Sequence, residues 1–249
     1  MPRKIILDTD IGTDVDDAFA VALAANSREL DVKAVTVVYG DVDMRAKIAR
    51  KLLNLAGRED IPVAKGLANP LTPGINPQMM RHEGKGILTP RDVDLKIYEK
   101  SAVDLIIEKV MKSDGDVTMI TIGPLTNFAT AIKKEPRIVK KISEYIFMGG
   151  AINPPIIKGK PLSPRFETNL NSDPLASRIV LGSGIPTKMV VMDVTWRALI
   201  GLSHLEKIRK AKTPITDALA NMLEIWLTAI EKHCEEIFGY KNVTAMHDP

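Results

Sequence analysis

Residues 5–18, IILDTDIGTDVDDA, decide the fold of this chain. The stretch opens with three aliphatic residues, and five aspartates follow within positions 8–17. A short aliphatic run of this kind is typical of a buried strand, and the residues from Asp16 onward have the spacing of a helix. Because a strand that leads directly into a helix is the first half of a βαβ unit, the stretch predicts an α/β fold.

The same alternation continues along the 249 residues. Short apolar runs predict strands over residues 4–7, 32–38, 61–64, 117–122, 145–148 and 188–192. Helical periodicity predicts helices over residues 16–25, 43–56, 102–112, 125–133, 174–181 and 214–238. Since no linker or repeat interrupts this pattern, we expect a single α/β domain over residues 1–249, with a mostly parallel central sheet flanked by helices.

The composition excludes several classes of protein. The chain is 45% hydrophobic and 26% charged, which is typical of a globular domain. Its formal net charge of +3 is too small for a nucleic-acid binder, and its apolar runs are too short to span a membrane. A single cysteine, Cys234, and the lack of a secretory signal predict a cytoplasmic protein without nucleic-acid or membrane partners.

Two of the predicted connections are long. Residues 65–100 and 150–166 are rich in Pro, Gly and Lys. Irregular stretches of this length are more often binding loops or lids than spacers, so we expect both to border a functional site.

The five aspartates predict a metal site. In open α/β sheets, ligands bind beyond the carboxyl ends of the strands, where these aspartates lie. Carboxylates this close raise one another's pKa unless a cation compensates, and the sequence has no Lys or Arg between Lys4 and Arg28. Oxygen ligands without nearby His or Cys favour Ca²⁺ or Mg²⁺, and a flexible acidic loop favours Ca²⁺. The alternative is that Asp14, Asp16 and Asp17 cap and charge the N-terminus of the next helix.

Two other acidic motifs fit this loop less well. An EF-hand loop that began at Asp8 would need an oxygen ligand at its fifth position, which is Gly12. The pair Asp8 and Asp10 also resembles a Mg²⁺-dependent phosphatase of the haloacid dehalogenase type, with Asp8 as nucleophile. That pattern has Thr two residues after the second aspartate, where this chain again has Gly12, so the phosphatase remains only an alternative.

Further blocks extend the pattern to the end of the chain. They are Gly123-Pro124-Leu125-Thr126-Asn127, Met148-Gly149-Gly150, Glu167-Thr168-Asn169, Asp173-Pro174 and His247-Asp248-Pro249. Together with residues 5–18, these blocks resemble the signature of the inosine-uridine preferring nucleoside hydrolases. The resemblance implies a Rossmann-like nucleoside hydrolase fold and hydrolysis of the N-glycosidic bond of ribonucleosides to ribose and free base. It also implies a Ca²⁺ ion that holds a water and two ribose hydroxyls.

The resemblance assigns roles residue by residue. It implies catalysis by Asp10, as the base for a calcium-bound water, and by His247, as the acid for the leaving base. The implied metal ligands are Asp8, Asp10, Asp17, the main-chain carbonyl of Ile122, and Asp248. The implied substrate contacts are Asp16, Asp41, His82, Met148, Glu167 and Asn169. The reaction builds positive charge on the ribosyl ring, which nearby carboxylates stabilise.

Some features depart from the family pattern. Asp14 has no assigned role, because the family has fewer residues in this loop. Asp41 stands where many members have Asn, and Pro161 replaces an Asn six residues before Glu167 that would contact the sugar. The sequence ends at Pro249, where family members continue, so we expect it to lack the family's C-terminal elements.

These departures leave a second hypothesis open, a catalytically silent homologue that binds metal and ribose. For either hypothesis the resemblance implies a small ribonucleoside as partner and a homodimer or homotetramer. The sequence does not predict whether purine or pyrimidine bases are preferred.

Overall fold

A six-stranded sheet forms the centre of the molecule. The computed structural model describes residues 1–154, 156–157, 159–238 and 241–249. The strands lie in the order β3-β2-β1-β4-β5-β8, and each neighbouring pair is parallel. Their bounds are Arg3–Thr9 (β1), Leu30–Val37 (β2), Val63–Lys65 (β3), Val117–Thr121 (β4), Ile142–Met148 (β5) and Thr187–Val190 (β8). Each strand predicted from the sequence is one of these six.

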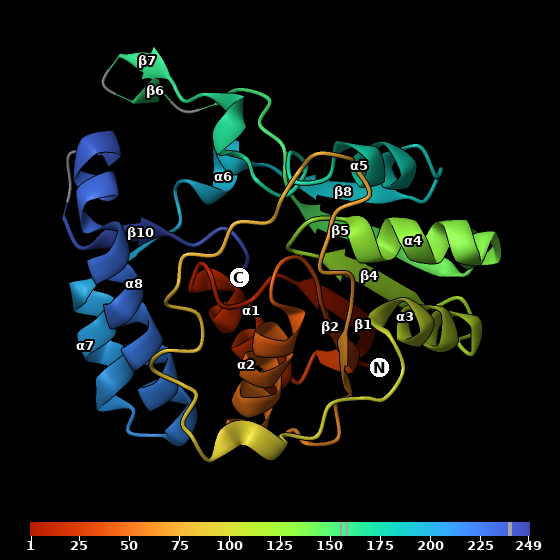
Figure 1. Cartoon of the computed structure of the whole chain (residues 1–249), viewed down its shortest axis with the longest axis horizontal. Helices are drawn as coiled ribbons and strands as arrows, with labels where there is room; N and C mark the ends of the chain where they lie inside the picture. The colour runs from red at the N-terminus through yellow and green to blue at the C-terminus, as the bar shows by residue number, and fades with distance from the viewer. Residues whose placement is uncertain (155, 158, 239–240) are drawn as a thin grey trace.

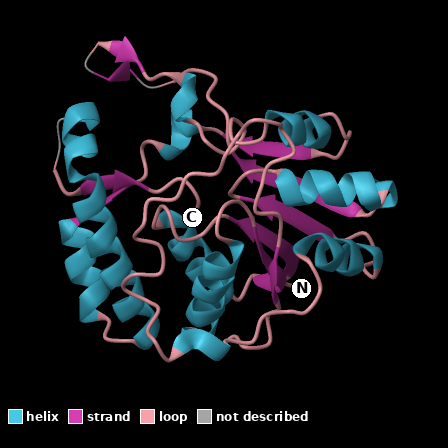
Figure 2. Ribbon diagram, viewed as in Figure 1, coloured by secondary structure: helices cyan, strands magenta, loops and turns pink. Residues whose placement is uncertain are grey.

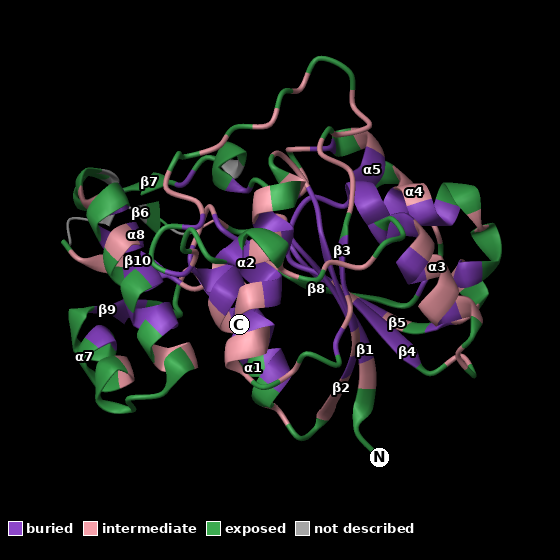
Figure 3. Ribbon diagram, turned by 60° about the horizontal axis from the view of Figure 1, so that its bottom comes forward, coloured by how far each residue is buried: buried purple, intermediate pink, exposed green. Residues whose placement is uncertain are grey.

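Helices cover both faces of the sheet (Figures 1 and 2). The predicted helices are present as Asp16–Asn26 (α1), Val42–Leu55 (α2), Ala102–Met111 (α3), Thr126–Lys134 (α4), Pro174–Leu181 (α5) and Pro214–Phe238 (α8). Ile5 and Leu7 of β1 belong to the hydrophobic cluster of α1, α2 and α8, whereas Ile6 belongs to the cluster of α3, α4 and α5. Because successive side chains of a strand point to opposite faces, β1 contributes to both cores. Figure 3 shows buried residues along β1, β2, β4 and β5, whereas β8 at the edge of the sheet is exposed.

Several short elements were not predicted. They are β6 (Ile156–Ile157), β7 (Lys160–Pro161), α6 (Met192–Thr195), β9 (Leu199–Gly201), α7 (Leu202–Lys210), β10 (Val243–Ala245) and the 3₁₀ turns Asp92–Asp94, Pro136–Lys140 and Pro164–Phe166. The predicted strand over residues 188–192 ends at Val190, because α6 begins at Met192. Elements of two to five residues are too short for a hydrophobic period to emerge, whereas α7 has nine residues but only one that is buried, Leu205.

The strands β9 and β10 form a separate two-stranded sheet, after which the end of the chain contacts the start of α1. The two strands are antiparallel, and Thr244 lies opposite Ile200. Just beyond β10, the main-chain N–H of Met246 donates to the carbonyl of Ala198 at 2.7 Å. As a result, the C-terminus lies beside α1 in the middle of the molecule (Figure 1). No helix in the described ranges has the length and apolar character needed to cross a membrane.

Asp173 anchors the long connection that follows β3. Its carboxylate is fully buried and accepts hydrogen bonds from the main chain of Leu71 (2.7 Å), Thr72 (3.1 Å) and Ala176 (3.1 Å). The hydroxyls of Thr72 (2.8 Å) and Thr126 (2.7 Å) donate to the same group. Burial alone raises the pKa of this carboxyl, but the hydrogen bonds outweigh burial and hold the pKa below its ordinary value. One carboxylate therefore ties the connection to α4 and α5.

We expect Asp173→Ala to lower the free energy of unfolding by about 3 kcal/mol or more, because several buried donors lose an ionised acceptor. Urea denaturation at neutral pH measures the loss. Since folding lowers the pKa of Asp173, its contribution is complete above about pH 4 and disappears as the pH falls further, so the difference between variant and wild type should shrink there.

The matched control is Asp94→Ala, which removes an exposed carboxylate from the same connection. We expect this variant to stay within about 0.5 kcal/mol of wild type. Equal stabilities for the two variants would contradict the anchoring role of Asp173.

Candidate active site

A cavity of about 460 Å³ lies at the carboxyl ends of the central strands. Nine residues predicted from the sequence line it together: Asp10, Asp16, Asp17, Ile122, Met148, Glu167, Asn169, His247 and Asp248. They come from the ends of β1, β4 and β5, from the start of α1, from the segment before α5 and from the end of the chain. The site is therefore at the edge of the sheet where ligands bind in open α/β folds.

Three carboxylates form a group that could hold a metal ion. One oxygen from each of Asp16, Asp17 and Asp248 lies within 4.8 Å of the others. Asp16 and Asp17 are the first two residues of α1, and each is 3% exposed. The N-cap of α1 is Val15, which has no side-chain capping bond, so the acidic residues charge the first turn of this helix but do not cap it.

Burial raises the pKa of each acid in the cavity. This holds for Asp10, Asp14, Asp16, Asp17 and Asp248. Repulsion from neighbouring carboxylates raises the pKa of Asp10, Asp14, Asp17 and Asp248 further, whereas the charge of His247 partly offsets the effect of burial on the pKa of Asp16. A bound cation would reverse both effects, since it favours the ionised form. The donor set consists of oxygen atoms, which suits a hard cation such as Ca²⁺ or Mg²⁺.

Asp8 lies beneath the cavity and does not line it. Its side chain is fully buried, and Oδ1 accepts from the Thr36 hydroxyl (2.5 Å) and from Nδ2 of Asn127 (2.8 Å). Within the described part of the chain, Oδ2 of Asp8 has no hydrogen-bond partner. Burial raises the pKa of Asp8 to about 7. A buried, unpaired oxygen beside the acidic group is a further observation that fits a cation.

The position of Asp8 also bears on the phosphatase alternative. A nucleophilic carboxylate must reach a phosphorus atom of its substrate, and Asp8 is enclosed by β2 and α4 through Thr36 and Asn127. The structure therefore does not support Asp8 as a nucleophile.

Glu167 and Asn169 lie on the opposite side of the cavity from β2. Both are buried, and Nδ2 of Asn169 donates to the carbonyls of Ile122 (3.0 Å) and Met148 (3.1 Å). Burial raises the pKa of Glu167, whose carboxylate accepts from the main-chain N–H of Leu170. The amide nitrogen of Asn169 is thus committed to the protein, and it links the ends of β4 and β5.

Three contacts hold His247 at the cavity. Its main-chain N–H donates to Oδ2 of Asp16 at 2.9 Å, and its ring Nδ1 lies 2.6 Å from the hydroxyl of Thr195. The ring of Trp196 lies against it, with centroids 5.3 Å apart. Burial lowers the pKa of His247, and the charge of Asp16 opposes this effect.

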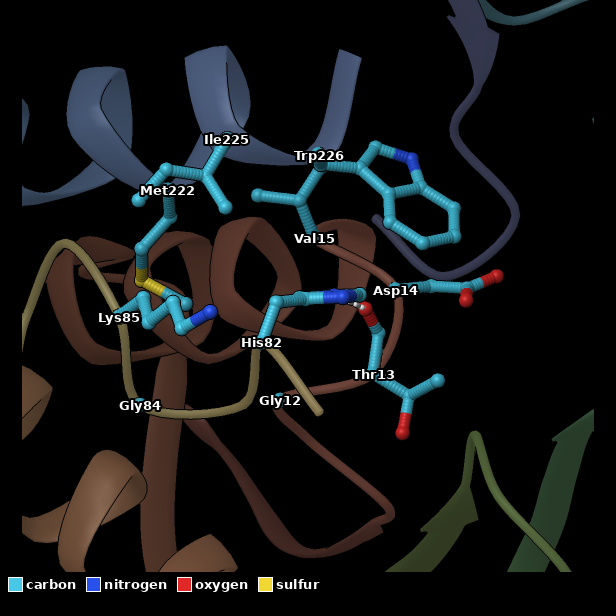
Figure 4. A pocket seen from close by; sticks show the side chains of 10 residues that line it. All are labelled: Gly12, Thr13, Asp14, Val15, His82, Gly84, Lys85, Met222, Ile225 and Trp226. Carbon is cyan, nitrogen blue, oxygen red and sulfur yellow. Dashed lines mark hydrogen bonds between the residues drawn. The ribbon is translucent and has the colours of Figure 1, made fainter. Parts of the chain in front are cut away.

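Two predicted substrate contacts lie outside the lining of the cavity. Asp41 is exposed and caps α2, because its side chain accepts from the main-chain N–H of Met44 at 2.9 Å. His82 lies in a small neighbouring pocket of about 10 Å³, where Nε2 is 2.7 Å from the carbonyl of Thr13 and the ring faces Trp226 (Figure 4). His82 thus connects the long loop after β3 to the acidic loop.

Sequence reasoning missed Arg45, which is 1% exposed and lines the cavity. Its guanidinium donates to the carbonyls of Tyr39 (2.6 Å) and Ile11 (2.9 Å) and to the hydroxyl of Thr13 (3.1 Å). The helical period contained a signal for this residue, since position 45 belongs to the same stripe of α2 as the buried Ala49. Asn127, Thr36 and Thr195 were missed as well; their hydrogen bonds link segments far apart in the sequence.

Comparisons with known proteins agree with this geometry. Residues 5–249 match the family described as inosine-uridine preferring nucleoside hydrolase. The pyrimidine-specific ribonucleoside hydrolase RihA of Salmonella arizonae is 35% identical over 253 residues, which cover 100% of this chain and 78% of that protein. RihA of Escherichia coli is 34% identical over the same shares of the two chains.

Solved structures show the same relationship. A plant nucleoside hydrolase, PpNRh1, superimposes with a TM-score of 0.84 at 30% identity, covering 100% of this chain and 77% of its own. A purine-preferring ribonucleoside hydrolase from Gardnerella vaginalis also gives 0.84 at 30% identity, covering 99% and 78%. The family predicted from the sequence blocks is confirmed, and the chain belongs to the inosine-uridine preferring nucleoside hydrolases.

Proposed function

We propose that this protein hydrolyses the N-glycosidic bond of ribonucleosides and releases ribose and the free base. The observation that supports this most is one cavity in which the carboxylates of Asp10, Asp16, Asp17 and Asp248 face Glu167 and Asn169. Several acids around one volume suit a reaction whose transition state is positively charged at the sugar.

We infer that the acidic group binds Ca²⁺. Asp10, Asp17, Asp248 and the carbonyl of Ile122 would hold the ion, with Asp8 beneath them. The close oxygens of Asp16, Asp17 and Asp248 and the unpaired Oδ2 of Asp8 fit such an ion. When bound, Ca²⁺ would lower the pKa of a water molecule and hold ribose hydroxyls.

In the proposed reaction, Asp10 accepts a proton from the water whose oxygen forms a bond to C1′ of the ribose. The bond between C1′ and the base nitrogen breaks, and its electron pair stays with the nitrogen. Asp16, Glu167 and Asn169 hold the ribose hydroxyls, while Met148 contacts the sugar. His247 donates a proton to the leaving base. One water is consumed for each bond broken: its hydroxyl group is bonded to C1′ of the ribose, and the base nitrogen gains a proton.

Asp41 and His82 are not part of this assignment, because the first caps α2 and the second lies outside the cavity. Pro161, whose counterpart in the family contacts the sugar, lies in β7 and is not among the residues that line the cavity. The named relatives include two pyrimidine-specific enzymes and one purine-preferring enzyme, so the activity is best tested on nucleosides of both kinds. We propose that the protein acts in the cytoplasm and that it forms a homodimer or homotetramer.

We expect Asp10→Asn to reduce the release of base from inosine, uridine and adenosine by at least about 100-fold, because the water loses its proton acceptor. A reducing-sugar assay measures the rate, and circular dichroism checks the fold. Asp94→Asn is the control and should retain the wild-type rate. Wild-type turnover by Asp10→Asn would refute the role of Asp10; nucleoside binding without turnover by the unaltered protein would favour the silent homologue.

Removal of divalent cations should lower both activity and thermal stability. A chelator takes away an ion that binds the folded state, and Ca²⁺ at about 100 times its dissociation constant contributes about 2.7 kcal/mol to folding. We expect the melting temperature to recover when Ca²⁺ is added back, and Asp17→Asn to abolish this response.

Differential scanning fluorimetry with Ca²⁺, Mg²⁺ and chelator measures the effect without a substrate. Asp114→Asn, on an exposed turn before β4, is the control and should respond as wild type does. A wild-type melting temperature that is the same with and without Ca²⁺ would contradict the metal site.

A further inference from the structure

Hydrogen bonds and a ring contact restrain the imidazole of His247. Its main-chain N–H donates a hydrogen bond to Oδ2 of Asp16 at 2.9 Å, and its Nδ1 lies 2.6 Å from the Thr195 hydroxyl. One face of the ring lies against Trp196, with an angle of 34° between the ring planes. With Nδ1 engaged by Thr195, Nε2 is the ring nitrogen available to a ligand in the cavity that His247 lines.

Thr195 is itself held firmly. It is 5% exposed and is the last residue of α6, and its hydroxyl also lies 3.5 Å from the carbonyl of Met192. The start of α6 is bonded to the loop that follows β5, because the N–H of Met192 donates to the carbonyl of Gly150 at 2.9 Å. The position of the hydroxyl is therefore set by the central sheet, which also positions the acidic cluster.

The contact between Thr195 and His247 joins segments 52 residues apart. A buried hydroxyl on one ring nitrogen fixes both the orientation and the tautomer of an imidazole. If the Thr195 hydroxyl donates to Nδ1, the neutral ring carries its proton on Nε2; if Nδ1–H donates to the hydroxyl, Nε2 carries a proton only in the imidazolium form. Donation from Nε2 of the neutral ring therefore requires the first arrangement.

We propose that Thr195 is a positioning residue, which directs Nε2 of His247 into the cavity and so places its proton at the nitrogen of the leaving base. This inference deepens the proposed function and rests on it. Thr195 does not touch the sugar or the base; it acts through the imidazole. Its loss should therefore slow reactions in which the leaving group needs a proton and spare those in which it does not.

Thr195→Val removes the hydroxyl and keeps the shape of the side chain, and Thr195→Ser restores the hydroxyl. We expect Thr195→Val to lower kcat for uridine and inosine by about 100-fold, as for other misplaced catalytic groups. On 4-nitrophenyl β-D-riboside, whose phenolate leaves without a proton, the rate should stay near that of wild type. Thr195→Ser should recover most of the loss on the nucleosides.

Thr130→Val is the matched control. It removes a half-buried hydroxyl that donates to the main chain within α4, and both substrates should react at the wild-type rate. If Thr195→Val loses equal rate on the nucleosides and on the nitrophenyl riboside, the role of Thr195 is structural. If it loses rate on neither substrate, Thr195 has no role in the reaction. Both results overturn the proposal.

A second measurement separates this inference from the proposed function. Long-range ¹H–¹⁵N NMR of the histidine rings, with the His247 signals identified by their absence in His247→Gln, reports the tautomer without any turnover. We expect one tautomer in wild type and in Thr195→Ser, and a mixture in Thr195→Val. If wild type hydrolyses neither substrate, the proposed function fails while the NMR still tests Thr195. An unchanged tautomer in Thr195→Val would overturn the inference.

Discussion

The site depends on holding several carboxylates close together inside the protein. Asp16, Asp17 and Asp248 have oxygens within 4.8 Å of one another, where repulsion and lost hydration both oppose ionisation. Neutral donors surround this group: the Thr9 hydroxyl bonds to Asp17, and the main-chain N–H of His247 bonds to Asp16. Such donors orient the carboxylates without neutralising them. A bound cation would favour the ionised form of these carboxylates, and the ionised carboxylates would suit a sugar that becomes positive.

The topology of the sheet gives the cavity two different sides. β1 lies in the middle of the strand order and delivers Asp8 and Asp10, with β2 and Arg45 on one side and β4 and β5 on the other. Asn169 links the ends of β4 and β5 on the side that also bears Glu167. Arg45 fixes the acidic loop from the side of β2 through Ile11 and Thr13. The acidic residues therefore lie between the contacts of Arg45 on one side and those of Asn169 on the other.

Local sequence determines the framework of this fold, and so it could be predicted. Each strand of the central sheet is preceded or followed by a clear change of period, as at the step from Leu7 to Asp16. The pairing of β9 with β10 was missed because each has three residues, and because contacts across 42 residues or more, such as Ile200 with Thr244, have no local pattern. The same reason hides Thr195 and Asn127, whose hydrogen bonds to His247 and Asp8 join residues 52 and 119 positions apart. Asp41 was predicted near the ligand from its resemblance to a family position, and in the structure its side chain caps α2.

The link between His247 and Asp16 has a consequence for how the protein is made. These residues are 231 positions apart, and Asp248 joins the acidic group from the same distant segment. During synthesis the strands and helices of the first half can pair while those later residues are still inside the ribosome. A nascent chain would then have its sheet before it has a complete set of acidic groups around the cavity. We expect the contact between residues 247–248 and the start of α1 to form last, because it closes the longest loop. The chain would bind a metal ion only after this contact has formed.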